Sequence, residues 1–350
     1  MPRFGRIGAL SGAALACVAA VVVPPQRPVT VVAVGDVLLD RGVGERIERS
    51  GKDALVEAVL PFTRGADLAV CNLECPLASG SPSALKPIVF GGPPAGARWL
   101  REAGFDAASL ANNHALDQGR AGLLQTMAAL DREGVAYFGA GATQAEACRA
   151  RIVRCNGRRL ALLGFTVFPD EGAFFDLRHA GTARADPQAV RRAVHQARAR
   201  ADVVIVAFHW GREYQALTSP AQRELARVAI DAGADLVVGH HPHVIQGAQL
   251  YRGRLIAYSL GNFIFDQHRR GADRALALRV TFVGDEAAAT FAPVQIADCF
   301  PRKPDDEAAQ SILAHFRTLC EGLGTRVAVN GGAATVSFAT RGHRDGADDY

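Results

Sequence analysis

The chain is poor in several residue patterns that mark common protein classes. Its 350 residues include only two tryptophans, two methionines and seven cysteines, and charged residues make up 21%. It has no block of basic residues and no alternation of basic with aromatic residues, so the pattern typical of nucleic-acid grooves is missing. Lys+Arg 39 against Asp+Glu 35 gives a formal net charge of +4. The basic residues are mostly arginine, and we interpret them as part of an ordinary solvated surface. We expect no nucleic-acid partner.

Long apolar runs are missing after the N-terminal segment, and the chain has no internal repeats. Residues 8–23 carry no charge, but these sixteen residues are fewer than the ~20 that a membrane-crossing helix needs. Basic residues precede this run and prolines end it, so residues 1–28 are predicted to be a secretory signal or an N-terminal membrane anchor. Ala14-Leu15-Ala16 is a candidate cleavage site, and Cys17 directly after it leaves lipid attachment open. The rest of the chain is therefore expected to be exported, in a periplasmic or other extracytoplasmic place.

The cysteines form no convincing set of thiolate metal ligands. Cys71 and Cys75 lie four residues apart, and on an extended strand their separation of ~13 Å is too long for a disulfide. Export would permit disulfides elsewhere, although six buried free thiols are an equal alternative. Two pairs are conceivable by proximity: Cys148 with Cys155, and Cys299 with Cys320.

Short apolar runs, each of the length of a buried strand, make up much of the remaining chain. In an α/β fold, polar residues just after such strands point into the crevice where ligands bind. Stretches with helical spacing separate the runs, and two alternating stretches near the end predict an antiparallel edge. The expected strands are 29–34, 67–71, 105–110, 135–139, 160–165, 202–207, 236–238, 255–260, 275–283 and 288–296. The expected helices are 44–60, 97–103, 122–133, 186–200, 220–231 and 305–321.

Two long connections are expected at the surface. Residues 79–96 are rich in serine, proline and glycine, and loops of this length are often functional. Residues 166–187 are interpreted as a loop that faces the substrate, with a simple surface loop as the alternative. The hairpin at 152–160 is predicted from its central Asn-Gly pair.

The polar residues at the strand ends form one constellation of carboxylate, amide and imidazole groups. Its densest part is His240-His241-Pro242-His243, where the proline prevents a helix and three imidazoles follow a core strand. Each residue alone also fits a cap, an ion pair or a surface histidine. Together they are too many for one tetrahedral zinc, and they fit two divalent metals ~3.5–4 Å apart that share a carboxylate and activate a water. The set is Asp36, Glu74, Asn113, His114, His209, His240, His241 and His243.

Six segments resemble the CapA capsule-synthesis, or poly-γ-glutamate synthesis, family, which is similar to the calcineurin-like metallophosphatases. They occur in family order between residues 29 and 300 and contain the polar strand ends. The resemblance implies an α/β fold, a four-layer α/β/β/α sandwich of the metallophosphatase type. The segments are GDVLLDR (35–41), NLECPL (72–77), NNHALDQG (112–119), HWGREY (209–214), GHHPHVIQ (239–246) and SLGNFIFD (259–266).

The same resemblance implies ligands for two divalent metal ions, with Mn, Fe, Zn and Mg all compatible. Glu74 would take the bridging place that the phosphatases give to aspartate, and His114 would be the general acid that protonates a leaving group. The other implied ligands are Asp36 for the first metal, Asn113 and His209 for the second, and His241 and His243, one to each metal.

Neighbouring residues are expected to support these ligands or to meet the substrate. His240 belongs to this group, although a shifted alignment would exchange it with His241. The others are Asp40, Arg41, Asn112, Trp210 and Asn262. The chain also departs from the phosphatase pattern, because Asp-x-His is here Asp36-Val37-Leu38, which removes one histidine ligand.

Three functions follow as hypotheses. The first is an exported or membrane-anchored, metal-dependent hydrolase of the phosphoesterase type that acts on a phosphoester or an anionic polymer in capsule, poly-γ-glutamate or cell-envelope metabolism. The second is a non-catalytic accessory subunit of a membrane synthase or export complex that holds such a polymer, and the third is a 5′-nucleotidase-like enzyme. The expected organisation is an N-terminal segment (1–28), a metallophosphatase-like domain (29–300), and a C-terminal helix with a weakly ordered tail (301–350).

Overall fold

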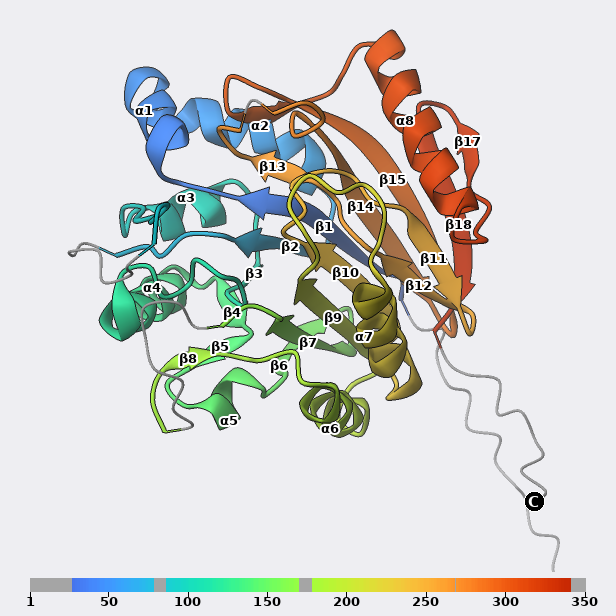
Figure 1. Cartoon of the computed structure of the whole chain (residues 1–350), viewed down its shortest axis with the longest axis horizontal. Helices are drawn as coiled ribbons and strands as arrows, with labels where there is room; N and C mark the ends of the chain where they lie inside the picture. The colour runs from blue at the N-terminus through green and yellow to red at the C-terminus, as the bar shows by residue number, and fades with distance from the viewer. Residues whose placement is uncertain (1–26, 79–85, 170–177, 268, 341–350) are drawn as a thin grey trace, which may run out of the picture.

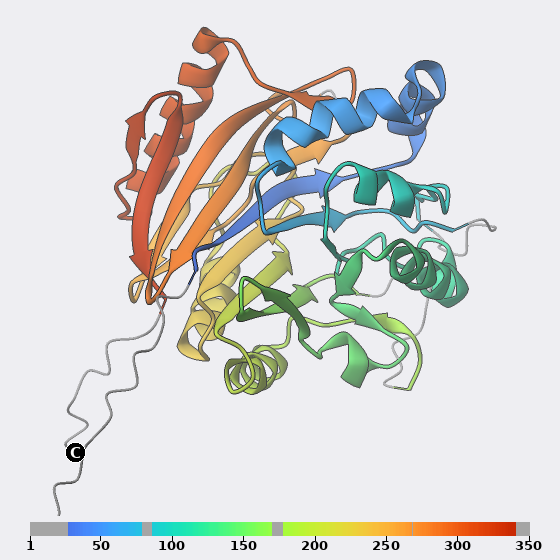
Figure 2. The ribbon, with the colours of Figure 1, turned by 180° about the vertical axis from the view of Figure 1, so that it is seen from behind.

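Two β-sheets packed face to face form the centre of the protein, and helices cover their outer faces (Figure 1). The structure is a computed structural model that describes residues 27–78, 86–169, 178–267 and 269–340. Viewed from behind, the helices between residues 41 and 133 lie against one sheet and away from the other (Figure 2). The fold is therefore a four-layer α/β/β/α sandwich, as the sequence predicts.

The first sheet has ten strands in the order β17-β18-β15-β14-β1-β2-β3-β4, with β13 beside β1 and β16 beside β15. Strands β1 to β4 run parallel, whereas β14, β15 and β18 continue the sheet in antiparallel fashion. Its strands are β1 (Val29–Val37), β2 (Leu68–Leu73), β3 (Ala107–Ser109), β4 (Ala136–Phe138), β13 (Asn262–Ile264), β14 (Arg274–Val283), β15 (Glu286–Ala297), β16 (Phe300–Arg302), β17 (Ala328–Asn330) and β18 (Ala333–Ala339).

The second sheet has six strands in the order β11-β12-β10-β9-β7-β6, and β7, β9, β10 and β12 are parallel. A separate pair joins β5 (Ala140–Gly141) to β8 (Gly181–Thr182). The strands of the second sheet are β6 (Arg151–Cys155), β7 (Arg158–Thr166), β9 (Val203–His209), β10 (Leu236–His240), β11 (Ala248–Tyr251) and β12 (Arg254–Ala257).

The helices close three apolar cores, one between the sheets and one on each outer face. Helices α1 to α4 cover the first sheet, α5 to α7 cover the second, and α8 packs on β15 where the inter-sheet core continues beyond the second sheet. The helices are α1 (Arg41–Ser50), α2 (Lys52–Thr63), α3 (Gly96–Glu102), α4 (Gly119–Glu133), α5 (Gln144–Ala147), α6 (Pro187–Arg198), α7 (Pro220–Asp231) and α8 (Asp306–Glu321).

Alternating residues of a central strand enter different cores, which explains the unbroken apolar runs. In β1, Val31 faces the second sheet, whereas Val32 packs against the helices on the outer face. In β9, Ile205 faces the first sheet, whereas Val204 packs against the helices on the outer face of the second sheet. Parallel strands buried on both faces require apolar residues at every position, so alternation is lost.

The structure corrects several expectations. The helical stretch 44–60 is two helices, because Gly51 adopts φ 78° and separates α1 from α2. The tail was expected to be weakly ordered, yet residues 328–339 form β17 and β18, and β18 pairs with β15 over six residues. Residues 181–182 of the supposed loop 166–187 form β8.

Neither conceivable disulfide is formed. All six cysteines in the described part of the chain are free thiols, and five of them are buried. Within the described ranges no helix combines the length and the apolar character that crossing a bilayer demands. The predicted signal or anchor at 1–28 falls almost entirely outside the described residues, as does the end of the predicted tail.

Candidate metal centre

The carboxyl ends of the parallel strands from both sheets meet at one edge of the sandwich. Asp36 lies near the end of β1, and Glu74 directly follows β2. Asn113 follows β3, while His209 and His240 end β9 and β10. Residues from separate parts of the sequence therefore converge, as expected for side chains at the carboxyl ends of parallel strands.

The histidine loop after β10 has an unusual backbone. His241 adopts φ 94° and His243 φ 56°, a region that residues other than glycine seldom occupy. The loop is held from two sides, because the His241 amide donates to Asp36 Oδ2 at 3.2 Å and the Tyr214 amide donates to the Pro242 carbonyl at 2.8 Å. Such conformations concentrate at functional sites, where surrounding contacts maintain them.

Two groups of buried side chains bring potential ligand atoms within 4.8 Å of one another. One group is Glu74, His241 and His243, and the other is Asp36, Glu74 and His209. Glu74 Oε1 lies 3.6 Å from His243 Nε2 and 3.8 Å from His209 Nε2. The Glu74 carboxylate thus belongs to both groups, which is the arrangement that two neighbouring cations sharing a carboxylate require.

Two of these potential ligand atoms form no hydrogen bond with the described residues. Glu74 Oε1 and His241 Nδ1 are buried, and among the described residues neither has a hydrogen-bond partner. Burial without a partner costs about 1–3 kcal/mol per group, and more for a charged one. A bound cation would satisfy these atoms, so the residues fit a metal.

The protonation states also suit cation binding. Burial, followed by the charge of His243, lowers the pKa of His241 to about 3. Burial, together with neighbouring imidazoles, holds the pKa of His209 well below its ordinary value. Both rings are therefore neutral near pH 7, the form that ligates metals. Burial and then the charge of Asp36 raise the pKa of Glu74 well above its usual range, a cost that a nearby cation would remove.

Asp36 is fully buried and ionised. Burial raises its pKa, but the imidazoles of His240 and His243 outweigh this and place the pKa well below the ordinary value. His240 Nδ1 lies 3.2 Å from Asp36 Oδ1, and His243 Nδ1 lies 3.3 Å from Oδ2. His243 Nδ1 also lies 2.8 Å from Asn262 Oδ1, so Asn262 orients the ring and leaves Nε2 directed at Glu74.

Asn72, which was not predicted as a site residue, lies at the centre of the cluster. Its side-chain amide donates to Asp36 Oδ1 at 2.8 Å and to Glu74 Oε2 at 3.2 Å, and lies 3.3 Å from His209 Nδ1. The signal was its spacing, since residues two apart in a strand point to the same side. Asn112 in turn donates to Asn72 Oδ1 at 3.3 Å and to the Leu73 carbonyl at 2.8 Å.

Asn72→Ala is expected to weaken Mn²⁺ binding about 10–100-fold, because partners of metal ligands contribute on that scale. Isothermal titration calorimetry measures the change, and circular dichroism monitors folding. Asn330→Ala, at an exposed position in β17, serves as the control. Parent-like affinity in Asn72→Ala would contradict the central role of this amide.

His114 lies beside this cluster and is held by its own set of contacts. Its Nδ1 lies 2.8 Å from Asp117 Oδ2, and its ring stacks on Phe90 with centroids 4.0 Å apart. Asp117 also accepts from the Phe90 amide at 2.7 Å and pairs with Lys86 Nζ at 2.6 Å. Burial, opposed by Asp117, lowers the pKa of His114, so the free ring is neutral near pH 7. Asp117, Lys86 and Phe90 were not predicted as site residues.

Both of the long connections predicted from the sequence contribute side chains that contact the cluster. Lys86 and Phe90 come from the described part of 79–96, and Lys86 also donates to the Asn113 carbonyl at 2.7 Å. From the described start of 166–187, the Phe168 ring packs 4.2 Å from that of His241 and 5.7 Å from that of His209. Residues 79–85 and 170–177 lie outside the described ranges.

The remaining predicted residues divide into two groups. Asn113 Oδ1 lies 2.8 Å from His209 Nε2, and Asn112 Oδ1 accepts from the His114 amide at 3.0 Å, so both amides belong to the cluster. Three others contact neighbouring structure instead. Asp40 accepts from the Gly91 amide at 2.8 Å, Arg41 pairs with Asp266 and lies over Phe90, and Trp210 is fully buried against Phe208 and donates to the Tyr258 carbonyl at 2.9 Å.

These features define a four-layer α/β/β/α sandwich with a candidate metal centre at the carboxyl ends of its strands. Residues 30–267 match the family model described as "Bacterial capsule synthesis protein PGA_cap", and the chain belongs to this family. The sequence resemblance to CapA proteins is thereby confirmed.

The names of several relatives agree with this assignment. "Capsule biosynthesis protein CapA" of Bacillus anthracis is 36% identical over 246 residues, which cover 68% of this chain and 60% of that protein. "PGA biosynthesis protein CapA" of Bacillus subtilis is 35% identical over 237 residues, covering 67% and 62%. A Mycobacterium tuberculosis protein named "Probable polyglutamine synthesis accessory protein" is 27% identical, covering 77% and 83%. The chain spans about three fifths of the length of the two Bacillus relatives.

Two solved structures from Thermus thermophilus are distant neighbours. TT1561 superposes with a TM-score of 0.43 at 15% identity, covering 73% of this chain and 99% of that one. A 5′-nucleotidase precursor superposes with a TM-score of 0.40 at 14% identity, covering 86% and 60%.

Proposed function

We propose that the protein is an exported, metal-dependent hydrolase of the phosphoesterase type that acts in capsule, poly-γ-glutamate or cell-envelope polymer metabolism. The observation that carries this proposal is the Glu74 carboxylate shared between two groups of buried donors, with His114 beside them. Membership of the capsule synthesis family and the names of the Bacillus relatives support a role in the metabolism of such a polymer. The N-terminal segment of the sequence supports export.

We assign two divalent cations to this site, one to each donor group. Glu74 would be common to both, Asp36, His209 and the amide oxygen of Asn113 would hold one side, and His241 and His243 would contribute the remaining nitrogens. Bound cations of this kind supply a Lewis acid and lower the pKa of a coordinated water.

The protein's own residues would orient and move protons. Asp117 fixes the His114 ring through Nδ1, and Lys86 holds Asp117 in turn. His114 Nε2 remains as the nitrogen that can exchange a proton with a reacting group. An anionic substrate beside the ring favours its protonated form, so substrate binding would prepare His114 to protonate the leaving group.

His114→Ala is expected to slow hydrolysis about 10²–10⁴-fold, the usual contribution of a positioned acid or base. The metal content should stay at the parent value, because His114 belongs to neither donor group. Turnover is measured on a panel of phosphoesters and γ-glutamyl oligomers, with exposed His315→Ala as the control. Parent-like rates in His114→Ala would remove its catalytic role, and a metal-loaded parent inactive on the whole panel would overturn the hydrolase proposal.

A second candidate function is a non-catalytic accessory subunit that holds an anionic polymer for a membrane synthase complex. The mycobacterial relative is named an accessory protein, which favours this alternative. In that case the donor cluster would stabilise the strand ends, and chelation would lower the unfolding temperature while no substrate turned over. Copurification of a membrane partner would support it.

A further inference from the structure

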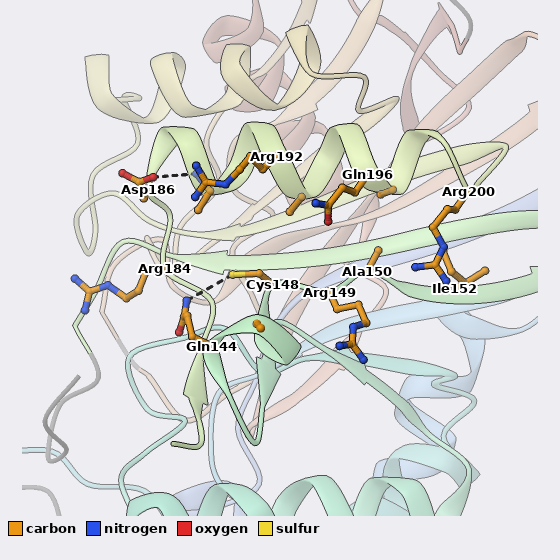
Figure 3. A pocket seen from close by; sticks show the side chains of 14 residues that line it. Gln144, Cys148, Arg149, Ala150, Ile152, Arg184, Asp186, Arg192, Gln196 and Arg200 are labelled. Carbon is orange, nitrogen blue, oxygen red and sulfur yellow. Dashed lines mark hydrogen bonds between the residues drawn. The ribbon is translucent and has the colours of Figure 1, made fainter. Parts of the chain in front are cut away.

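A surface cavity of about 710 Å³ lies between α6 and the segment that runs from α5 into β6 (Figure 3). None of its lining residues belongs to the candidate metal centre. Side chains enter it from opposite sides: Gln196 and Arg200 come from the α6 side, and Arg149 and Ile152 come from the side of β6.

Four arginines and a single carboxylate line this cavity. The carboxylate, Asp186, already caps α6, since its Oδ1 accepts from the Ala189 amide at 2.9 Å. Within the described ranges Arg149, Arg192 and Arg200 form no ion pair with a carboxylate. These three guanidinium groups repel one another, so an external anion would be attracted to them. The fourth arginine that lines the cavity is Arg184.

The α6 wall has the form of a linear track. Arg192 and Gln196 lie one turn apart on α6, and Arg200 lies two residues beyond the end of the helix, so the three side chains follow one another along this wall (Figure 3). A parallel row of alanines at 189, 193 and 197 makes a flat apolar strip next to them. Separated cations beside an apolar strip suit an extended chain better than one compact anion.

We propose that this cavity binds a segment of a linear polycarboxylate, in which short aliphatic links separate successive carboxylates. The carboxylates would pair with the arginines, whose planar guanidinium groups donate two parallel hydrogen bonds to one carboxylate. The aliphatic links would pack on the alanine strip and Ile152. Binding here requires neither metal nor turnover, so the site is independent of the proposed hydrolase function.

The test measures binding of a fluorescently labelled poly-γ-glutamate oligomer to the full chain by anisotropy. The Arg192→Gln/Arg200→Gln double variant is expected to bind about tenfold more weakly, with a shallower dependence on salt. Arg132→Gln/Arg326→Gln removes the same charge from exposed positions outside the cavity and should bind like the parent. Arg192→Lys/Arg200→Lys should recover part of the affinity, because it keeps the charge but not the fork.

Three results would overturn the proposal. The parent protein could fail to bind the oligomer, both glutamine double variants could weaken binding equally, or inorganic phosphate could compete as well as the oligomer. A metal-free Asp36→Ala protein should still bind the oligomer. Loss of binding in that variant would place the polymer at the metal centre instead of the arginine cavity.

Discussion

Asp36→Ala is expected to weaken Mn²⁺ binding by at least about 100-fold. The change deletes a direct ligand, whereas loss of a residue that merely supports a ligand already costs 10–100-fold. It also removes the acceptor of two hydrogen bonds, one from the Asn72 side chain and one from the His241 amide. The group of Glu74, His241 and His243 would therefore lose part of its orientation. Isothermal titration calorimetry on the chelated protein measures the affinity, and elemental analysis the content per chain.

Two variants make this result interpretable. Asp36→Asn keeps the shape of the side chain and should also lose the metal, which separates lost charge from lost packing. Asp53→Ala removes a carboxylate that is 83% exposed on α2 and should bind like the parent. Parent-like affinity in both Asp36 variants, with the fold intact by circular dichroism, would remove Asp36 from the ligand set.

Gly239→Ala is expected to destabilise the protein by about 3 kcal/mol or more. A Cβ at this position would lie 1.9 Å from the Tyr258 carbonyl oxygen and 2.5 Å from Trp210 Nε1. The β10 backbone would have to move, and the 2.9 Å hydrogen bond from Trp210 to Tyr258 would break. We expect the thermal midpoint to fall by about 5–10 °C, measured by calorimetry. Metal affinity should fall as well, since His240 follows directly.

Gly44→Ala is the matched control. Its Cβ would meet nothing within 4 Å, and the position lies inside α1. There alanine should stabilise by about 0.5–1 kcal/mol, because glycine costs that much in a helix. If Gly239→Ala and Gly44→Ala had the same effect on stability, the close approach of β10 to Tyr258 would be wrong.

The fold and most of the donor cluster could be predicted because they rest on local patterns. Apolar runs such as 202–207 marked strands buried on both faces, and a polar residue after each run marked the shared edge. The Asn-Gly pair at 156–157 marked its hairpin. These signals depend on neighbouring residues alone.

What escaped prediction depends on contacts between distant segments. Asn72 looked like an ordinary strand residue until the register of β1 with β2 placed it opposite Asp36. Asp117 gained its role from Lys86, which lies 31 positions earlier in the sequence, and no local pattern joins them. β18 was missed because its strand character depends on pairing with β15.

The departure from Asp-x-His also has a structural explanation. Leu38, at the position where the resemblance implies a histidine, is fully buried in the core on the outer face of the first sheet. It cannot serve as a ligand, and the described site contains His240 as an additional imidazole 3.2 Å from Asp36. The chain therefore keeps a nitrogen next to this carboxylate, but it comes from the β10 loop.

The most direct test of the proposed two-metal centre is the metal content of the purified protein, measured by elemental analysis after reloading with Mn, Fe, Zn or Mg. We expect close to two ions per chain, with both lost when Asp36 and His243 are replaced by alanine. A chain that binds no metal under any of these conditions would contradict the shared role of Glu74 and leave the donor cluster without its proposed purpose.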